Sequence, residues 1–98
     1  MSAANPSRQQ EVEVLELEEN DTGDSSVRDL VVFNDDINTF EHVIRTLIEV
    51  CQHTQEQAEQ CTLIIHYKGK CTVKNGTFEY LAPMRNAICD RGISAEVI

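Results

Sequence analysis

Residues 30–41, LVVFNDDINTFE, decide how the globular part of this chain is expected to fold. The apolar run LVVF at residues 30–33 is rich in strand formers and predicts a short β-strand. The polar run NDD at residues 34–36 ends that strand, because such side chains bond their own backbone and favour turns. Asn38 is the predicted helix cap, with Glu41 three residues later as its capping-box partner. The stretch therefore predicts a strand, a turn and a helix in succession.

Two helices are expected next. In the first, apolar residues recur at helical spacing at Phe40, Val43, Ile44, Leu47 and Cys51. The second is predicted to start at Thr54, with Gln57 in the capping-box position and Gly69 as a C-cap.

Further elements follow toward the C-terminus. Residues 70–74 are short and partly apolar and predict a strand, and Asn75-Gly76 predicts a turn. A third helical pattern begins at Thr77 and ends at Gly92, and Pro83 within it is expected to kink the helix or to be its first residue. Residues 94–98 predict a last short strand. The order βααβαβ predicts an α+β sandwich of helices on a small sheet.

Charge and composition divide the chain in two. It has 98 residues and a net charge of −9, of which −6 falls in residues 1–26. We expect residues 1–26 to be a flexible acidic extension and residues 27–98 to form one domain. Residues 11–17, EVEVLEL, alternate like a strand, although Glu at every second position opposes one. The acidic balance argues against nucleic acid as a partner.

The sequence also indicates a compartment. It contains no apolar run long enough to span a membrane and no hydrophobic secretory segment at its start. The four cysteines are therefore expected to be reduced thiols in a cytoplasmic protein.

Two polar features could carry chemistry. Carboxylate and amide oxygens at residues 34–36 could receive a cation or a primary ammonium group, or they could simply form a polar turn. His66 could accept a hydrogen bond from an ammonium, or it could be satisfied by the backbone. The ligand interpretation requires His66 to face the turn.

Nothing in the sequence predicts an enzyme, a cofactor or a metal site. The cysteines (Cys51, Cys61, Cys71 and Cys89) are widely spaced and lack the close pairs typical of structural zinc, so we interpret them as small buried hydrophobes. No phosphate loop, nucleophile elbow or nucleotide fingerprint is present.

Taken together, three stretches resemble the ClpS family of Clp protease adaptors. They are VFNDDINTFE at residues 32–41, AEQ at residues 58–60 and IHYKGK at residues 65–70. The resemblance covers roughly residues 30–98. It implies three helices on a three-stranded antiparallel sheet. It also implies an adaptor that binds substrates beginning with Leu, Phe, Tyr or Trp and hands them to a Clp AAA+ unfoldase of the ClpA or ClpC type.

The resemblance also assigns residues to roles. The family's ammonium-binding positions fall on Asn34, Asp35, Asp36 and His66. Its pocket-wall positions fall on Ile37, Asn38, Phe40, Val43, Thr62, Ile65 and Ala95. Many members carry Met where this chain has Phe40 and Thr62, so a stiff ring and a polar group replace flexible thioethers. Contacts with the unfoldase are expected at Glu79 and Arg85, and residues 1–26 have the character of the family's delivery extension.

Two other classes of function remain open on the sequence. The same element order resembles the C-terminal domain of the ribosomal stalk protein, a protein-interaction module, although stalk domains typically carry a Lys-rich helix and this chain is acidic. A thiol- or metal-dependent regulator built on the four cysteines is the third class. In the adaptor interpretation the protein is expected to be a monomer.

Overall fold

The central strand carries the apolar run that begins the globular part. The computed structural model describes residues 26–98, and in it Leu30, Val31 and Val32 are all buried. The elements are β1 (Arg28–Phe33), α1 (Phe40–Cys51), α2 (Gln55–Lys68), β2 (Lys70–Gly76), α3 (Phe78–Asp90) and β3 (Ala95–Val97). The predicted order βααβαβ is confirmed. The expected strand at residues 11–17 lies outside the described residues.

The three strands form one antiparallel sheet in the order β2-β1-β3. Leu30 pairs with Lys74 on one side and with Val97 on the other. The register with β2 shifts between Leu30 and Val31, which marks a β-bulge. β1 therefore has a strand on each side, whereas β2 and β3 each present one free edge.

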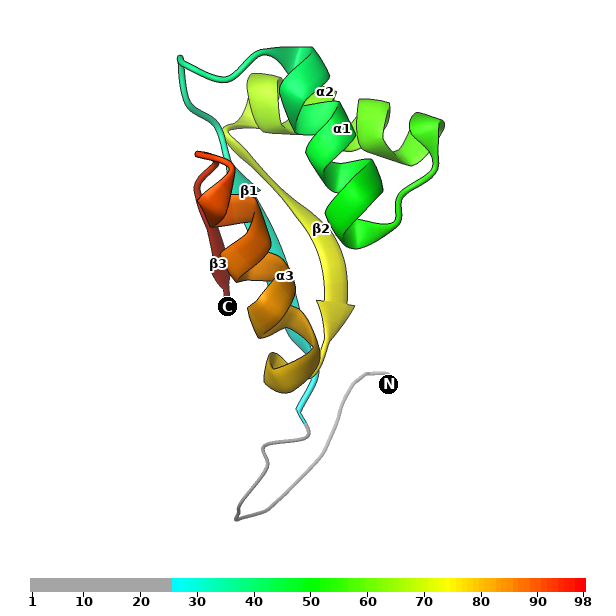
Figure 1. Ribbon diagram of the computed structural model, residues 1–98, viewed down its shortest axis with the longest axis vertical. Coiled ribbons are helices and arrows are strands. Elements are labelled where there is room, and N and C mark those ends of the chain that lie inside the picture. The colour runs from blue at the N-terminus through cyan, green and yellow to red at the C-terminus, as the bar shows by residue number, and fades with distance from the viewer. Residues whose placement is uncertain (1–25) are drawn as a thin grey trace.

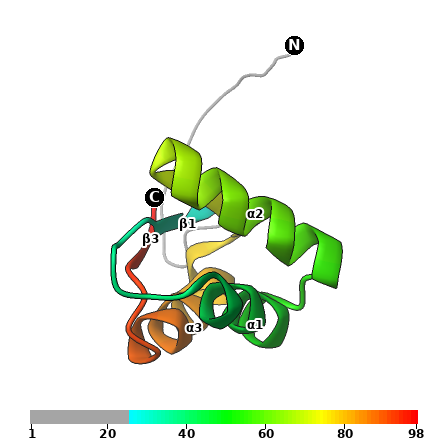
Figure 2. The same cartoon turned by 90° about the horizontal axis from the view of Figure 1, so that it is seen from above.

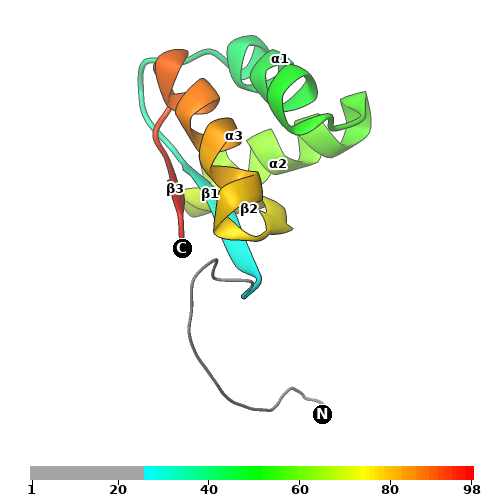
Figure 3. The same cartoon turned by 60° about the horizontal axis from the view of Figure 1, so that its bottom comes forward.

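The helices form a layer against this sheet. α3 lies across one face of the sheet (Figure 1), and α1 packs beside α3 and against α2 (Figure 2). The core between them consists of buried apolar side chains from all three helices and from the strands: Leu30, Val32, Val43, Leu47, Cys51, Ala58, Ile65, Val73, Leu81, Ile88, Ile93 and Ala95. The C-terminus lies close to the start of β1 (Figure 3), where Asp29 and Ile98 exchange backbone hydrogen bonds.

A threonine caps the N-terminus of each helix. The hydroxyls of Thr39, Thr54 and Thr77 accept a hydrogen bond from the backbone amide three residues later. The capping box of Thr54 with Gln57 and the C-cap at Gly69 are confirmed, and Gly69 suits its role because its φ is 93°. The prediction that Asn38 caps α1 is wrong. Thr39 is the cap, because Asn38 is bonded within the preceding turn.

Two further expectations need correction. Asn75-Gly76 is the end of β2 and not a separate turn, since Asn75 still pairs with Asp29 and its side chain donates to the Asp29 carboxylate. The alternative that Pro83 is the first residue of the third helix is wrong, because α3 runs from Phe78 to Asp90 with Pro83 as its sixth residue. Proline has no amide hydrogen to donate to the preceding turn. Pro83 is solvent-exposed, so the carbonyl that loses this donor can be hydrated.

Candidate functional site

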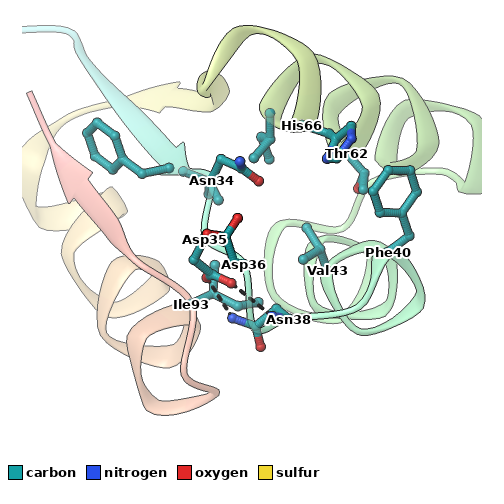
Figure 4. A pocket seen from close by; sticks show the side chains of 12 residues that line it. Asn34, Asp35, Asp36, Asn38, Phe40, Val43, Thr62, His66 and Ile93 are labelled. Atoms are coloured by element: carbon teal, nitrogen blue, oxygen red, sulfur yellow. Dashed lines mark hydrogen bonds between the residues drawn. The ribbon is translucent and has the colours of Figure 1, made fainter.

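A cavity of about 230 Å³ opens where the β1–α1 turn faces the C-terminal half of α2. Figure 4 shows the turn residues on one side of it and side chains from α1 and α2 on the other. Residues from β1, the turn, α1, α2 and the segment before β3 line the cavity: Val32, Phe33, Asn34, Asp35, Asp36, Asn38, Phe40, Val43, Thr62, Ile65, His66 and Ile93. The turn at residues 34–36 and His66 therefore face the same space, which the ligand interpretation of the sequence requires.

The turn is held by the Asp35 carboxylate. Its Oδ1 accepts from the backbone amides of Ile37 and Asn38, each at 2.8 Å, and its Oδ2 accepts from Asn38 Nδ2 at 2.7 Å. The bond from the Asn38 amide is the main reason that the pKa of Asp35 is lowered. Asn38 Nδ2 also donates to the Gly92 carbonyl at 2.8 Å, which ties the turn to the end of α3.

Asn34 and Asp36 present polar atoms that the chain does not use. The backbone amide of Asn34 donates to the Gly69 carbonyl at 2.9 Å, so the turn is also fixed to the end of α2. Within residues 26–98, however, neither the Asn34 side-chain amide nor the Asp36 carboxylate has a hydrogen-bond partner, and both residues are exposed. Their oxygens are available as acceptors at the mouth of the cavity.

His66 completes the polar side from α2. Its ring makes an edge-to-face contact with Phe40 at a centroid distance of 5.1 Å, and another with Tyr67 at 4.9 Å. It makes no hydrogen bond to another residue of the described range. A neutral imidazole at this position has a nitrogen lone pair that can accept from a ligand.

The apolar side of the cavity is built from buried side chains. Val43, Ile65 and Ile93 are each less than a tenth exposed. The Thr62 hydroxyl donates to the Ala58 carbonyl at 2.7 Å, so its hydrogen is already used within α2. The polar group expected at this wall is thus satisfied by its own helix, and the side of the cavity formed by Val43, Ile65 and Ile93 is apolar.

The structure separates two of the expected wall residues from the cavity. The Ile37 side chain is 88% exposed, because residue 37 lies at the outside of the turn that Asp35 closes. Ala95 is buried in β3, where it pairs with Val32, and Ile93 lines the cavity instead. Val32, Phe33 and Ile93 line the cavity although the sequence did not predict them there. Phe33 adjoins the NDD turn, so its position was a usable signal, whereas nothing in the local sequence pointed to Ile93.

The residues expected to contact the unfoldase lie on α3, away from the cavity. Glu79 is exposed in the first turn, and Arg85 is exposed with its Nε donating to the Ala95 carbonyl at 3.2 Å. Two side chains that are six residues apart on a helix point about 120° away from each other around the helix axis. Glu79 and Arg85 therefore do not share one face of α3, and Arg85 covers part of the free edge of β3.

The cysteines form no reactive centre in this part of the chain. All four are free thiols. Burial raises the pKa of Cys51 to about 11 and that of Cys71 to about 12, which keeps both in the unreactive thiol form. Among the described residues, no three His, Cys, Asp or Glu side chains gather where they could hold a metal ion. No helix of residues 26–98 has the length and apolar character needed to span a membrane.

Comparison with known proteins gives the chain a context. Residues 25–94 match the family model described as ATP-dependent Clp protease adaptor protein ClpS. Among solved structures, Agrobacterium tumefaciens ClpS2 bound to L-phenylalaninamide superposes with a TM-score of 0.73 at 15% sequence identity, covering 76% of this chain and 98% of that one. At this identity the likeness shows a shared fold. None of the curated proteins matches the chain.

Proposed function

The chain belongs to the ClpS family of Clp protease adaptors, and on this premise we propose that it captures proteins by their first residue. The ligand is a free α-amino group together with a bulky apolar side chain, as in proteins that begin with Leu, Phe, Tyr or Trp. Capture needs no catalytic residue and no cofactor. The bound protein is then passed to a Clp AAA+ unfoldase for degradation in the cytoplasm.

The polar side of the cavity supplies the recognition of the amino group. An α-ammonium has three N–H donors and one positive charge. Asn34, Asp36 and His66 offer acceptors that no residue of the described range occupies. Asp35 adds negative charge, and because both of its oxygens already accept bonds from the turn, we assign it chiefly to holding the turn in place. Hydrogen bonds to a charged donor contribute about 1.5–3 kcal/mol each.

The apolar side supplies the recognition of the side chain. A cavity of about 230 Å³ is below the range of roughly 300–1,000 Å³ typical of sites for drug-sized ligands. It suits a single side chain packed against Val43, Ile65 and Ile93. The Agrobacterium structure was obtained with L-phenylalaninamide, which has a free amine and an aromatic side chain. That ligand supports the same chemistry for this chain.

One observation carries the proposal: acceptors unused by residues 26–98 face a cavity that has one apolar side and is sized for one side chain. Titration calorimetry should compare a peptide beginning with Phe, with its amine free, against the same peptide acetylated. Acetylation removes the charge and two donors, so we expect a loss of affinity of at least about tenfold. A peptide beginning with Ser and having a free amine controls for the side chain. Equal affinity for the free and acetylated peptides would contradict the proposal.

Delivery is proposed to depend on parts of the chain outside the cavity. Residues 1–26 carry a charge of −6 and few large apolar side chains, so we assign them to engagement of the unfoldase, together with Glu79 and Arg85. Deleting residues 1–26 should leave the affinity for a Phe peptide within about twofold and slow degradation of a Phe-starting reporter by an unfoldase–peptidase of the ClpA or ClpC type. A large loss of peptide affinity on truncation would show that the extension takes part in capture.

We also propose that the protein is a monomer, and sedimentation of the free protein tests this oligomeric state.

A further inference from the structure

The three histidines of this chain are held in two different ways. His42 Nε2 donates to the Arg91 carbonyl at 2.9 Å, and His53 Nε2 donates to the Val73 carbonyl at 2.7 Å. Each of these bonds fixes the orientation of its ring and the nitrogen that carries the hydrogen. His66 has no such bond within residues 26–98 and is placed instead by two aromatic rings. The histidine that faces the cavity is therefore the one whose orientation depends on ring packing.

Of the two aromatic rings that contact His66, those of Phe40 and Tyr67, the Tyr67 ring is the less expected neighbour. Neighbouring residues on a helix diverge by about 100°, so consecutive side chains do not normally face each other. The Tyr67 ring nevertheless lies 4.9 Å from the His66 ring, with an interplanar angle of 80°. Its side chain is 78% exposed and makes no hydrogen bond to a residue of the described range. Its contact with His66 is the only ring contact that Tyr67 makes within residues 26–98.

The position of Tyr67 separates its role from that of Phe40. Phe40 lines the cavity and contacts His66 at 5.1 Å, so it can affect a ligand directly. Tyr67 contacts the same imidazole but is not among the residues that line the cavity. Any influence of Tyr67 on the bound first residue must therefore pass through His66.

We propose that Tyr67 is a positioning residue that holds the His66 imidazole against Phe40, with a nitrogen directed at the site of the ammonium. This inference rests on the proposed function. Edge-to-face packing restricts rotation of the imidazole before the ligand arrives, so less side-chain freedom is lost on binding. Because the contact uses the ring of Tyr67, its hydroxyl is not required.

The test is a double-mutant cycle with L-phenylalaninamide as the probe. Tyr67→Ala should weaken binding about three- to tenfold, in line with the strength of one aromatic pair. Tyr67→Phe keeps the ring and should bind within about twofold of the wild type. In a His66→Ala background, Tyr67→Ala should have no further effect on the affinity. Because Tyr67 is exposed, the melting temperature should not change in any Tyr67 variant.

A second measurement needs no ligand. The three histidines allow the ring protons of each to be assigned by NMR, and the His66 signals should move on Tyr67→Ala and stay in place on Tyr67→Phe. Unmoved His66 signals, or an equal loss of affinity with and without His66, would overturn the positioning role. If wild-type protein fails to bind L-phenylalaninamide, the proposed function falls. If His66→Ala weakens binding and Tyr67→Ala does not, the positioning role alone falls.

Discussion

The polar groups at the two ends of the layer formed by α1 and α2 differ in their hydrogen bonding. At one end they bond to other residues of the described range, and at the other end they do not. Beyond the C-terminus of α1, His53 Nε2 donates to the Val73 carbonyl at 2.7 Å and Lys74 Nζ donates to the Cys51 carbonyl at 3.0 Å. Thr54 and Gln57 close a reciprocal capping box beside them. At the N-terminal end of α1, the side chains of Asn34, Asp36 and His66 face a cavity and bond to no residue of the described range.

The difference separates groups that maintain the fold from groups that are available to a ligand. A buried polar atom must find a partner, or folding bears the cost of removing it from water. His53 is buried, and its Nε2 donates to the Val73 carbonyl of β2, whereas its Nδ1 has no hydrogen-bond partner among the described residues. Asn34, Asp36 and His66 are exposed, so water can satisfy them until a ligand arrives. We expect the first set to control stability and the second to control affinity.

The largest effect is expected at the buried end. His53→Ala removes a buried ring and leaves the Val73 carbonyl without its donor. The free energy of unfolding should fall by about 2–4 kcal/mol, measured by urea denaturation. His42→Ala is a matched control, because His42 also donates to a carbonyl but lies in a partly exposed position, and it should cost less than about 1 kcal/mol. Similar losses of unfolding free energy in His53→Ala and His42→Ala would contradict the special contribution of the buried end to stability.

The next effect tests the open end. His66→Ala removes an acceptor from the cavity without removing a hydrogen bond to another residue of the described range. Affinity for a free-amine Phe peptide should fall by at least about tenfold, because a bond to a charged donor is lost. The free energy of unfolding should stay within about 0.5 kcal/mol of the wild type, since His66 is exposed. If stability falls and affinity holds, the assignment of the two ends is reversed.

Most of the fold followed from local sequence signals. Branched apolar residues predicted β1, and the threonine and glycine signals at Thr54 and Gly69 placed both ends of α2 closely. The errors lay where tertiary bonds override local preference. Asn38 has the chemistry of a helix cap, but its amide bonds Asp35 and the distant Gly92 carbonyl instead. Pro83 is compatible with α3 because its exposed position relieves the loss of one backbone bond.

The site was only partly readable from the sequence. Asn34, Asp36 and His66 stand in recognisable motifs, and the fold places them at one cavity. Ile93 is far from those motifs along the chain and reaches the cavity only through the pairing of β3 with β1. Ile37 lies inside a motif, yet the turn closed by Asp35 directs its side chain to solvent. Sequence patterns identify the polar residues of the cavity better than its apolar walls, because packing between distant segments decides which apolar side chains line it.

A smaller effect is expected at Asp35, whose substitution should lower both the stability of the fold and the affinity for a peptide. Asp35→Asn replaces one acceptor oxygen with a donor group that cannot accept from Asn38 Nδ2. We expect a loss of about 1 kcal/mol in the free energy of unfolding, together with a moderate loss of peptide affinity from a loosened turn. Asp36→Asn is the control, since its carboxylate makes no bond to a residue of the described range, and it should lower affinity without lowering stability.

The contribution of Asp35 to the free energy of unfolding should depend on pH in a defined direction. Its pKa is lowered in the folded protein, chiefly by the bond from the Asn38 amide, so folding favours the charged form. The resulting stabilisation is fully present above the ordinary carboxyl pKa of about 3.9 and is lost as the pH falls through the lower, folded-state pKa. Acid unfolding of Asp35→Asn should lack this component. Identical acid profiles for the variant and the wild type would show that the carboxylate does not stabilise the turn.

The smallest effect concerns Phe40, which borders the open end as the first residue of α1. Its ring is 43% exposed, lines the cavity and contacts His66, so it is not simply a core residue. An aromatic wall can pack edge-to-face with an aromatic guest and gives Leu no such contact. Peptides beginning with Phe should therefore bind more tightly than those beginning with Leu. Phe40→Met should reduce the ratio of the Phe-peptide affinity to the Leu-peptide affinity by about two- to fivefold.

Phe78→Met is the matched control, because Phe78 also follows a threonine cap, is half-exposed and lies away from the cavity. If Phe40→Met lowers the melting temperature and leaves the Phe-to-Leu ratio unchanged, Phe40 belongs with the residues that maintain the fold.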